Sequence, residues 1–176
     1  IEKAKRYYEQ SFAIAQETQD QCSEGRVLGL LGTLAQIKGQ REEAKQHYEQ
    51  SLAIAQSVHD QYGKGLAHFY LGQLSACCDE RTETCFHQAL KLLREQDMMK
   101  YAEVALIFGI LLIRQGDKHE DGRPLIEESL NLFAHMGLPN QKATNALMVQ
   151  FECNDPAVGS PVQLSDKQVE GNRGNV

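Results

Sequence analysis

A cluster of three cysteines and one histidine has the residue types that bind zinc. Its members are Cys77, Cys78, Cys85 and His87. Structural zinc sites prefer paired ligands such as Cys-x2-Cys, which bring two thiolates onto one tetrahedral ion. Adjacent cysteines at a helix end cannot easily chelate one ion. We therefore expect buried or half-buried thiols here and no metal site.

Other short motifs resemble catalytic or nucleotide-binding sequences without matching them. Gly63-Lys64-Gly65 lacks the upstream glycine of a P-loop, and His119-Glu120-Asp121 lacks the His-Glu-x-x-His spacing of a zinc protease. The six histidines are scattered, so solvated or hydrogen-bonded imidazoles are the simpler interpretation. The sequence therefore predicts a protein without catalytic residues and without a cofactor.

The composition argues against several further classes of function. The chain has 176 residues, of which 18 are basic and 24 acidic, so its net charge is −6. A general nucleic-acid or membrane-surface binder would need a dense basic surface. No stretch reaches the ~20 apolar residues of a membrane span. Five cysteines do not fit a disulfide scaffold and favour reduced thiols in a cytoplasmic protein.

An internal repeat in the sequence indicates the secondary structure in which these residues lie. Residues 1–20 and 41–60 align without a gap, and twelve of the twenty positions are identical. Self-similarity at a fixed period of 20 to 50 residues indicates a solenoid or another repeat array. The repeated stretch reads YEQSFAIAQ in the first copy and YEQSLAIAQ in the second.

The spacing of apolar and small residues indicates that each unit is a pair of helices. Ala44, Tyr48, Ser51 and Ala55 fall on one helical face, and a second run of helical spacing, over residues 27–37, precedes them. Glycine at the end of that run predicts a tight turn and an antiparallel pair. We expect about eight helices, at residues 1–18, 21–38, 41–58, 61–78, 80–95, 98–115, 120–136 and 139–152.

Several small, aliphatic and aromatic residues of the unit together resemble the tetratricopeptide-repeat (TPR) pattern. In the second unit these are Leu31-Gly32, Ala35, Gly39, Ala44, Tyr48 and Ser51, and Leu71-Gly72 recurs forty residues later. The resemblance implies an all-α, right-handed superhelical solenoid of antiparallel helix pairs. The unit of about 40 residues exceeds the usual 34. In this it is similar to the repeats of kinesin light chains, LGN/Pins scaffolds and bacterial NB-ARC sensor arrays.

The expected organisation is a TPR array followed by a tail. We expect the array over residues 1–153, beginning in mid-repeat as a piece of a longer array. Residues 154–176 are rich in Gly, Pro, Asn and Ser, which is typical of a flexible tail.

In TPR solenoids the first helices line the inner, concave face, and the resemblance implies that a protein or peptide binds there. We assign the inward-facing positions of each unit by counting residues from its Leu-Gly pair. These positions predict a concave face that changes from polar to apolar along the array. We expect Phe69, Leu106, Ile110 and Ile113 to form an exposed patch, unless Ile110 and Ile113 pack against the eighth helix or the tail. The predicted partner-binding residues are Arg26, Thr33, Gln36, Leu66, Phe69, Gln73, Glu103, Leu106, Ile110 and Ile113.

Three functions remain open at this point. The first is a non-enzymatic scaffold that binds a peptide or protein segment in the concave groove. The second is a sensor or regulatory segment of a larger signalling ATPase or transcriptional regulator. The third is a self-associating assembly module that forms homo-oligomers through exposed terminal helices. None of them requires nucleic acid or insertion into a membrane.

Overall fold

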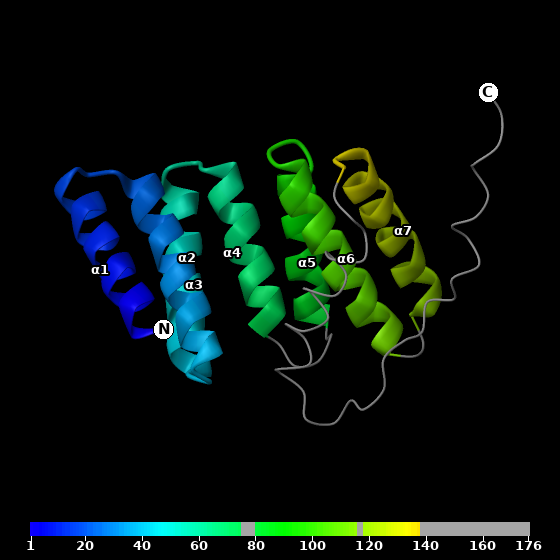
Figure 1. The fold of residues 1–176 in the computed structure, drawn as a ribbon, viewed down its shortest axis with the longest axis horizontal. Helices are drawn as coiled ribbons and strands as arrows, with labels where there is room; N and C mark the ends of the chain where they lie inside the picture. The colour runs from blue at the N-terminus through cyan, green and yellow to red at the C-terminus, as the bar shows by residue number, and fades with distance from the viewer. Residues whose placement is uncertain (75–79, 116–117, 138–176) are drawn as a thin grey trace.

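The computed structural model describes residues 1–74, 80–115 and 118–137, and within these ranges all regular structure is helical (Figure 1). Consecutive helices run antiparallel, and α2 with α3, α4 with α5 and α6 with α7 form closely packed pairs. The expected all-α fold of sequential antiparallel pairs is thus confirmed. The seven helices of the described residues are α1 (Glu2–Glu17), α2 (Gln21–Ile37), α3 (Arg41–Ser57), α4 (Gln61–Leu74), α5 (Glu80–Leu93), α6 (Met98–Arg114) and α7 (His119–His135).

An aspartate begins the first helix of each pair. Side-chain oxygens of Asp20, Asp60 and Asp97 each accept a hydrogen bond from the backbone N–H three residues later, at 3.1, 3.0 and 2.9 Å. Such caps satisfy N–H groups that have no partner inside the helix. The aspartates that recur in the sequence therefore mark the helix starts.

The turns that end α1, α2 and α3 share one backbone conformation. Gln19, Gly39 and His59 all have positive φ, at 55°, 74° and 58°. This left-handed region closes a helix by letting the next N–H reach back to a carbonyl in its last turn. Only glycine adopts it without a steric penalty. Gln19 and His59 therefore keep the turn geometry at a small conformational cost.

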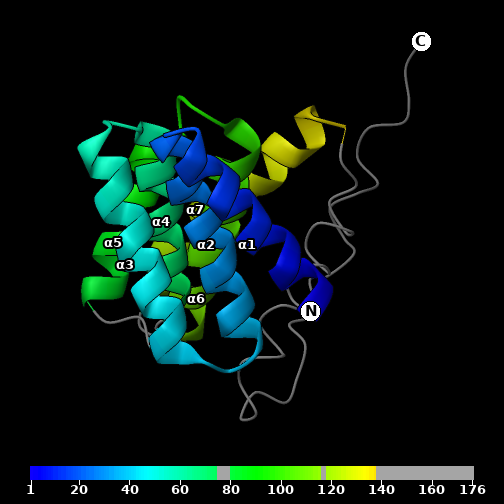
Figure 2. The ribbon, with the colours of Figure 1, turned by 90° about the vertical axis from the view of Figure 1, so that its left-hand side faces the viewer.

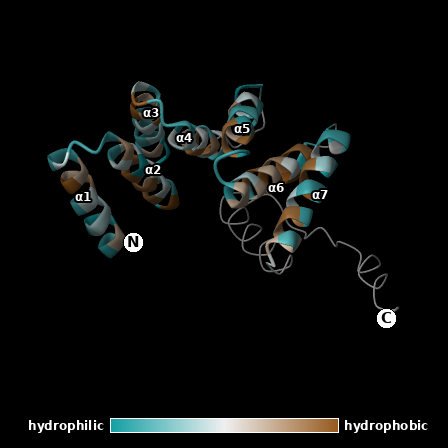
Figure 3. Cartoon of the chain, turned by 90° about the horizontal axis from the view of Figure 1, so that it is seen from above, coloured by the Kyte–Doolittle hydropathy of each residue, from teal (hydrophilic) through white to brown (hydrophobic). Residues whose placement is uncertain are grey.

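The helices divide between two sides of the molecule. Seen along the stack and from above, α3 and α5 lie on one side, and α2, α4 and α6 lie on the other (Figures 2 and 3). The last pair is turned relative to the first two, so that α7 lies beside α6 and away from the edge formed by α3 and α5. Helices α3 and α5 thus present a different face from α2, α4 and α6.

Aromatic rings link the units through the core. Tyr48 stacks on Tyr70 with ring centres 5.1 Å apart, and Phe69 lies next to Tyr70. Phe69 meets Phe86 edge-on, and Phe86 stacks on Phe108 at 4.9 Å. These five rings form a continuous series from α3 to α6. Such contacts add stability beyond the area they bury.

Several expectations fall on residues that the structure does not describe. The expected helix at 139–152 and the tail at 154–176 lie outside the described residues, as do Cys77 and Cys78. Seven of the eight expected helices are confirmed on the described residues, and the one expected at 61–78 is confirmed only as far as Leu74, because residues 75–79 lie outside the described ranges. In the described part of the chain, no helix combines the length and apolar character that crossing a membrane requires.

Candidate partner-binding face

The ten residues predicted to bind a partner all lie on the first helices, α2, α4 and α6. We call the side formed by these three helices the first-helix face. Helix α4 packs directly against α2 and is set back between α2 and α6 in the view from above (Figure 3). The fold therefore places the polar residues of α2 and the apolar residues of α6 on either side of α4.

Arg26 joins α2 to the start of α4. Its Nη2 donates a hydrogen bond to Oδ2 of Asp60 at 3.3 Å, and its guanidinium carbon lies 5.4 Å from the centre of the Tyr62 ring. Asp60 also caps α4 by accepting from the N–H of Gly63. Because the Arg26 side chain is about half exposed, its ion pair adds little stability and leaves N–H groups for a partner.

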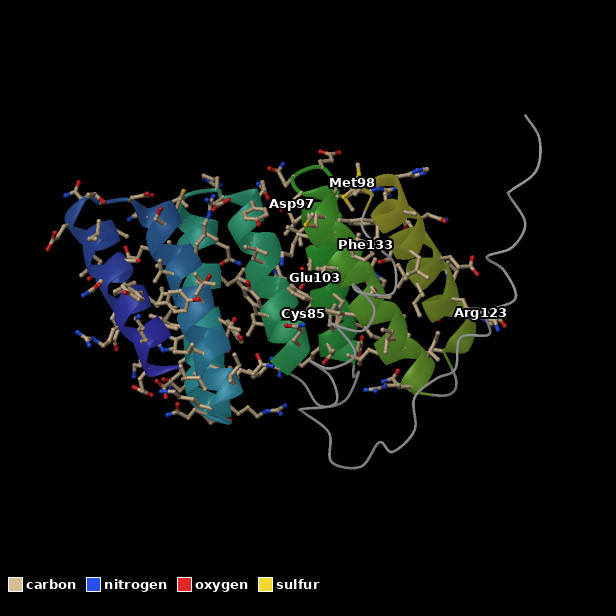
Figure 4. The ribbon with its side chains drawn as sticks, in the orientation of Figure 1. Cys85, Asp97, Met98, Glu103, Arg123 and Phe133 are labelled. Atoms are coloured by element: carbon tan, nitrogen blue, oxygen red, sulfur yellow. The ribbon has the colours of Figure 1, made fainter. Side chains whose placement is uncertain are left out.

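A second polar junction joins α4 to α6. The Tyr62 hydroxyl donates to Oδ2 of Asp97 at 3.4 Å, and Asp97 accepts from the backbone N–H of Lys100. Nζ of Lys100 donates to Oε2 of Glu103 at 2.5 Å. Figure 4 shows Asp97 at the upper end of α6 and Glu103 lower on the same helix. This junction orders a phenol, an ammonium and a carboxylate beside one another.

The protonation states at this junction follow from burial and charge. Burial raises the pKa of both Tyr62 and Tyr70. Burial alone would lower the pKa of Lys100, but the hydrogen bond and the negative charge of Glu103 outweigh it and raise that pKa. At neutral pH the face therefore offers neutral phenol groups and a charged ammonium as donors, and the Glu103 carboxylate as an acceptor.

Thr33 and Gln36 of α2 hold the Tyr48 side chain. The Tyr48 hydroxyl donates to Oε1 of Gln36 at 2.8 Å and lies 3.4 Å from Oγ1 of Thr33. Burial raises the pKa of Tyr48 to about 12. Two of the predicted polar contact residues thus also have a packing role, because they satisfy a buried hydroxyl.

The expected exposure of two apolar residues is wrong. Phe69 is 2% exposed and Leu106 is 1% exposed, and both belong to the main hydrophobic core. Phe69 is covered by the rings of Tyr70 and Phe86, so it lies inside the aromatic series. The other predicted apolar residues, Leu66, Ile110 and Ile113, are half-buried, as is Gln73.

Three residues of the first-helix face were not among the predicted contacts. Tyr62 and Tyr70 on α4 contact residues of neighbouring units, and Lys100 on α6 pairs with Glu103 of its own helix. Tyr62 and Lys100 follow the capping aspartates by two and three residues, a part of the helix that counting from the Leu-Gly pair does not reach. The periodic aspartates were the signal that could have found them.

Of the cysteine cluster, Cys85 and His87 lie within the described residues. Cys85 is half-buried on α5, and Figure 4 shows it near the lower ends of α4 and α5. Within residues 1–74, 80–115 and 118–137, His, Cys, Asp and Glu form no group of three or more that could hold a metal ion. The prediction of no metal at Cys77 and Cys78 lies outside the described residues.

Comparison with known proteins supports the repeat assignment for the first three helices. The family model described as tetratricopeptide repeat matches residues 1–57, which contain α1, α2 and α3. A comparison with curated protein sequences gave no match. The chain therefore contains a tetratricopeptide repeat within an all-α array of helix pairs. TPR units are generally protein–protein interaction modules.

Proposed function

We propose that this protein is a non-enzymatic scaffold that binds a peptide or protein segment on its first-helix face. The observation that carries the proposal is the ordered set formed by Tyr62, Tyr70, Lys100 and Glu103 between α4 and α6. These side chains are half-buried, so a partner can reach them while their conformations are restrained. Restrained donors and acceptors lose less entropy on binding than free ones.

The chemistry of this face favours a partner that combines polar and aliphatic groups. Lys100 and Arg26 supply cationic donors, Glu103 supplies an acceptor, and half-buried Leu66, Ile110 and Ile113 supply apolar contact. Each of these charged side chains already forms an ion pair within the chain, since Arg26 pairs with Asp60 and Lys100 pairs with Glu103. The face therefore selects by hydrogen-bond pattern more than by net charge.

The test exchanges the Lys100–Glu103 pair for two glutamines and leaves the net charge unchanged. The Lys5–Glu9 pair on α1 is the matched control, because it is also an ion pair within one helix, at 3.8 Å. The full chain is used as bait, and a captured partner is then titrated against both double variants and wild type. We expect the Lys100→Gln, Glu103→Gln variant to bind at least about tenfold more weakly, the loss of one charge-assisted hydrogen bond. Equal affinity for both variants would remove this face as the binding site.

A second candidate function, self-association through α1, has its own supporting observation. Ser11 is exposed and donates to Tyr7 of its own helix, whereas the equivalent Ser51 is buried and donates to Gly25 of α2. Ile14 is 59% exposed, whereas the equivalent Ile54 lies against Gly25. The packing side that α3 uses against α2 is thus uncovered on α1.

The arrangement of the other helices restricts how such self-association could occur. Each of α2, α4 and α6 already packs against its own second helix, so a homotypic contact would join α1 to α1 of another copy. Sedimentation of wild type and of Ile14→Asp tests this. A dimer that the substitution dissociates supports the candidate function, and a wild-type monomer at all concentrations contradicts it.

A further inference from the structure

Two clefts lie at equivalent positions of successive repeats, away from the first-helix face. The smaller, about 190 Å³, is lined by residues of α1, α2 and α3. The larger, about 300 Å³, is lined by residues of α3, α4 and α5. In each case two second helices form the walls and the end of the first helix between them forms the floor. We call them the α1/α3 cleft and the α3/α5 cleft.

One wall of each cleft carries the same ion pair. Lys5 and Glu9 lie 3.8 Å apart on α1, and Lys45 and Glu49 lie 3.9 Å apart on α3. All four residues line a cleft. The floors match as well, since Leu31 of one repeat corresponds to Leu71 of the next. The two clefts are therefore copies of one architectural feature and can be compared position by position.

The opposite walls differ in charge. Glu43 and His47 of α3 line the α1/α3 cleft, and Arg81 and Cys85 of α5 stand at the equivalent positions of the α3/α5 cleft. The α3/α5 cleft also gains Arg41 at the start of α3. The α3/α5 cleft has three lysine or arginine side chains and two glutamates, whereas the α1/α3 cleft has two of each. Of the two clefts, only the α3/α5 cleft has more lysine and arginine side chains than glutamates.

We propose that the α3/α5 cleft binds a peptide segment in which an acidic side chain stands beside an aliphatic one. The carboxylate lies between Arg41 on α3 and Arg81 on α5, and the aliphatic side chain lies on Leu71 and Leu74. Neither guanidinium forms a salt bridge among the residues that the structure describes. Arginine is suited to this role because its planar N–H groups match a carboxylate.

Helices α3 and α5 both start at this cleft, and each carries two glutamates in its first turn. Both walls begin at this cleft, because Arg41 is the first residue of α3 and Arg81 the second of α5. Helix N-termini carry a partial positive charge. Gln40 precedes α3 and makes no side-chain cap, and the N–H of Arg41 donates to the Gly39 carbonyl instead.

The size of the cleft limits what it holds. About 300 Å³ is at the lower end of the range for ligand pockets, which suits one or two side chains and not a large cofactor. The floor is apolar, since Leu74 is buried and Leu71 half-buried. An aliphatic side chain would cover these leucines, and the three cations at the rim would hold its acidic neighbour.

The experiment uses two short probes with the full 176-residue chain. One is acetyl-Leu-Leu-Glu-Leu-amide, and the other replaces its glutamate with glutamine. Both are titrated while backbone amide shifts are followed by NMR. We expect the glutamate peptide to shift the amides of Arg41, Lys45 and Arg81. The glutamine peptide should bind at least about tenfold more weakly, because it lacks the charge-assisted contact.

Two variants identify the cleft that binds. The double variant Arg41→Gln, Arg81→Gln should weaken binding of the glutamate peptide about tenfold or more. The control Lys5→Gln removes one cation from the α1/α3 cleft and should leave the affinity unchanged. Thermal melting of both variants checks that they fold. Absent binding, equal affinity for both peptides, shifts at the α1/α3 cleft or the first-helix face, or wild-type affinity of the double variant each overturns the proposal.

Discussion

The ring of Tyr48 lies directly over Gly32, so close that a Cβ on Gly32 would stand 2.5 Å from Cε1 of the ring. Tyr48 cannot easily move, because its hydroxyl donates a hydrogen bond to Gln36 and its ring stacks on the Tyr70 ring. The glycine of the Leu-Gly pair therefore permits close contact between α2 and α3. In the next unit Phe86 lies over Gly72, and a Cβ on Gly72 would stand 3.0 Å from Cε2 of the Phe86 ring.

Gly32→Ala should destabilise the protein despite the better helix propensity of alanine. Alanine gains up to ~1 kcal/mol as a helix former, but overpacking against a fixed ring costs ~1–3 kcal/mol. We expect a net loss of about 1–2 kcal/mol in the free energy of unfolding, measured in urea. Gly72→Ala is the matched control and should lose less, because Phe86 needs to move only slightly. A larger loss at Gly72 would contradict this account.

Ser51→Ala and Ser11→Ala test the different surroundings of two equivalent residues. Ser51 is buried and donates to the Gly25 carbonyl at 2.7 Å, so its loss should cost about 1 kcal/mol of unfolding free energy. Ser11 is exposed and bonds only within α1, so its replacement should change stability by less than about 0.5 kcal/mol. Equal effects of the two substitutions in urea unfolding would show that α1 is covered in solution.

Local signals in the sequence were sufficient for the helices and their pairing. Asp20, Asp60 and Asp97 precede helices because a carboxylate can cap free N–H groups, and this chemistry needs only three neighbouring residues. The repeat then supplied the packing partners, since Tyr48 and Phe86 occupy the same position in successive units. Helix starts and core positions could therefore be predicted without any knowledge of the tertiary structure.

Exposure on the first-helix face could not be predicted in the same way. Counting from the Leu-Gly pair places Phe69 and Leu106 on this face, but the depth of a side chain depends on residues of the neighbouring helices. Phe69 is covered by Phe86 of α5, and Tyr62 reaches Asp97 of α6. These contacts depend on how one unit is turned against the next, which repeat spacing does not specify.

Tyr48 should make stability sensitive to alkaline pH. Its pKa is about 12 in the folded protein against about 10 in an unfolded chain. A raised pKa means that the Tyr48 hydroxyl keeps its proton to a higher pH in the folded protein than in the unfolded chain. Its contribution to the free energy of unfolding is therefore complete below about pH 10 and is lost between about pH 10 and pH 12. Tyr48→Phe should be about 1 kcal/mol less stable at neutral pH, because the bond to Gln36 is lost.

The measurement compares urea unfolding of wild type and Tyr48→Phe at about pH 9 and about pH 11. Wild type should lose about 1 kcal/mol more than the variant over this interval. The other tyrosines are present in both proteins, so their titration cancels in the comparison. Identical losses would mean that Tyr48 titrates normally and that its hydroxyl is hydrated.

His68 should make stability sensitive to mildly acidic pH. Burial lowers the pKa of His68, and its Nδ1 is buried without a hydrogen-bond partner among the residues that the structure describes. His68 therefore binds a proton more readily in the unfolded chain than in the folded protein. Its contribution to the free energy of unfolding is complete above about pH 6.5 and decreases as the pH drops below that value. Urea unfolding at about pH 7.5 and about pH 5.5 should show a smaller decrease for His68→Gln than for wild type. An equal decrease in both would assign the acid sensitivity to other groups.

Phe69→Ala should act on stability first and on binding only as a consequence. Phe69 is 2% exposed and contacts the rings of Tyr70 and Phe86, so its truncation opens a cavity in the aromatic series. Such substitutions cost ~3–5 kcal/mol, a large part of the ~5–15 kcal/mol that stabilises an ordinary domain. Leu66→Ala, three residues earlier on α4, is the control and should cost about 1–2 kcal/mol because Leu66 is half-buried. A loss below about 1 kcal/mol for Phe69→Ala would mean that the ring is exposed in solution and free to contact a partner.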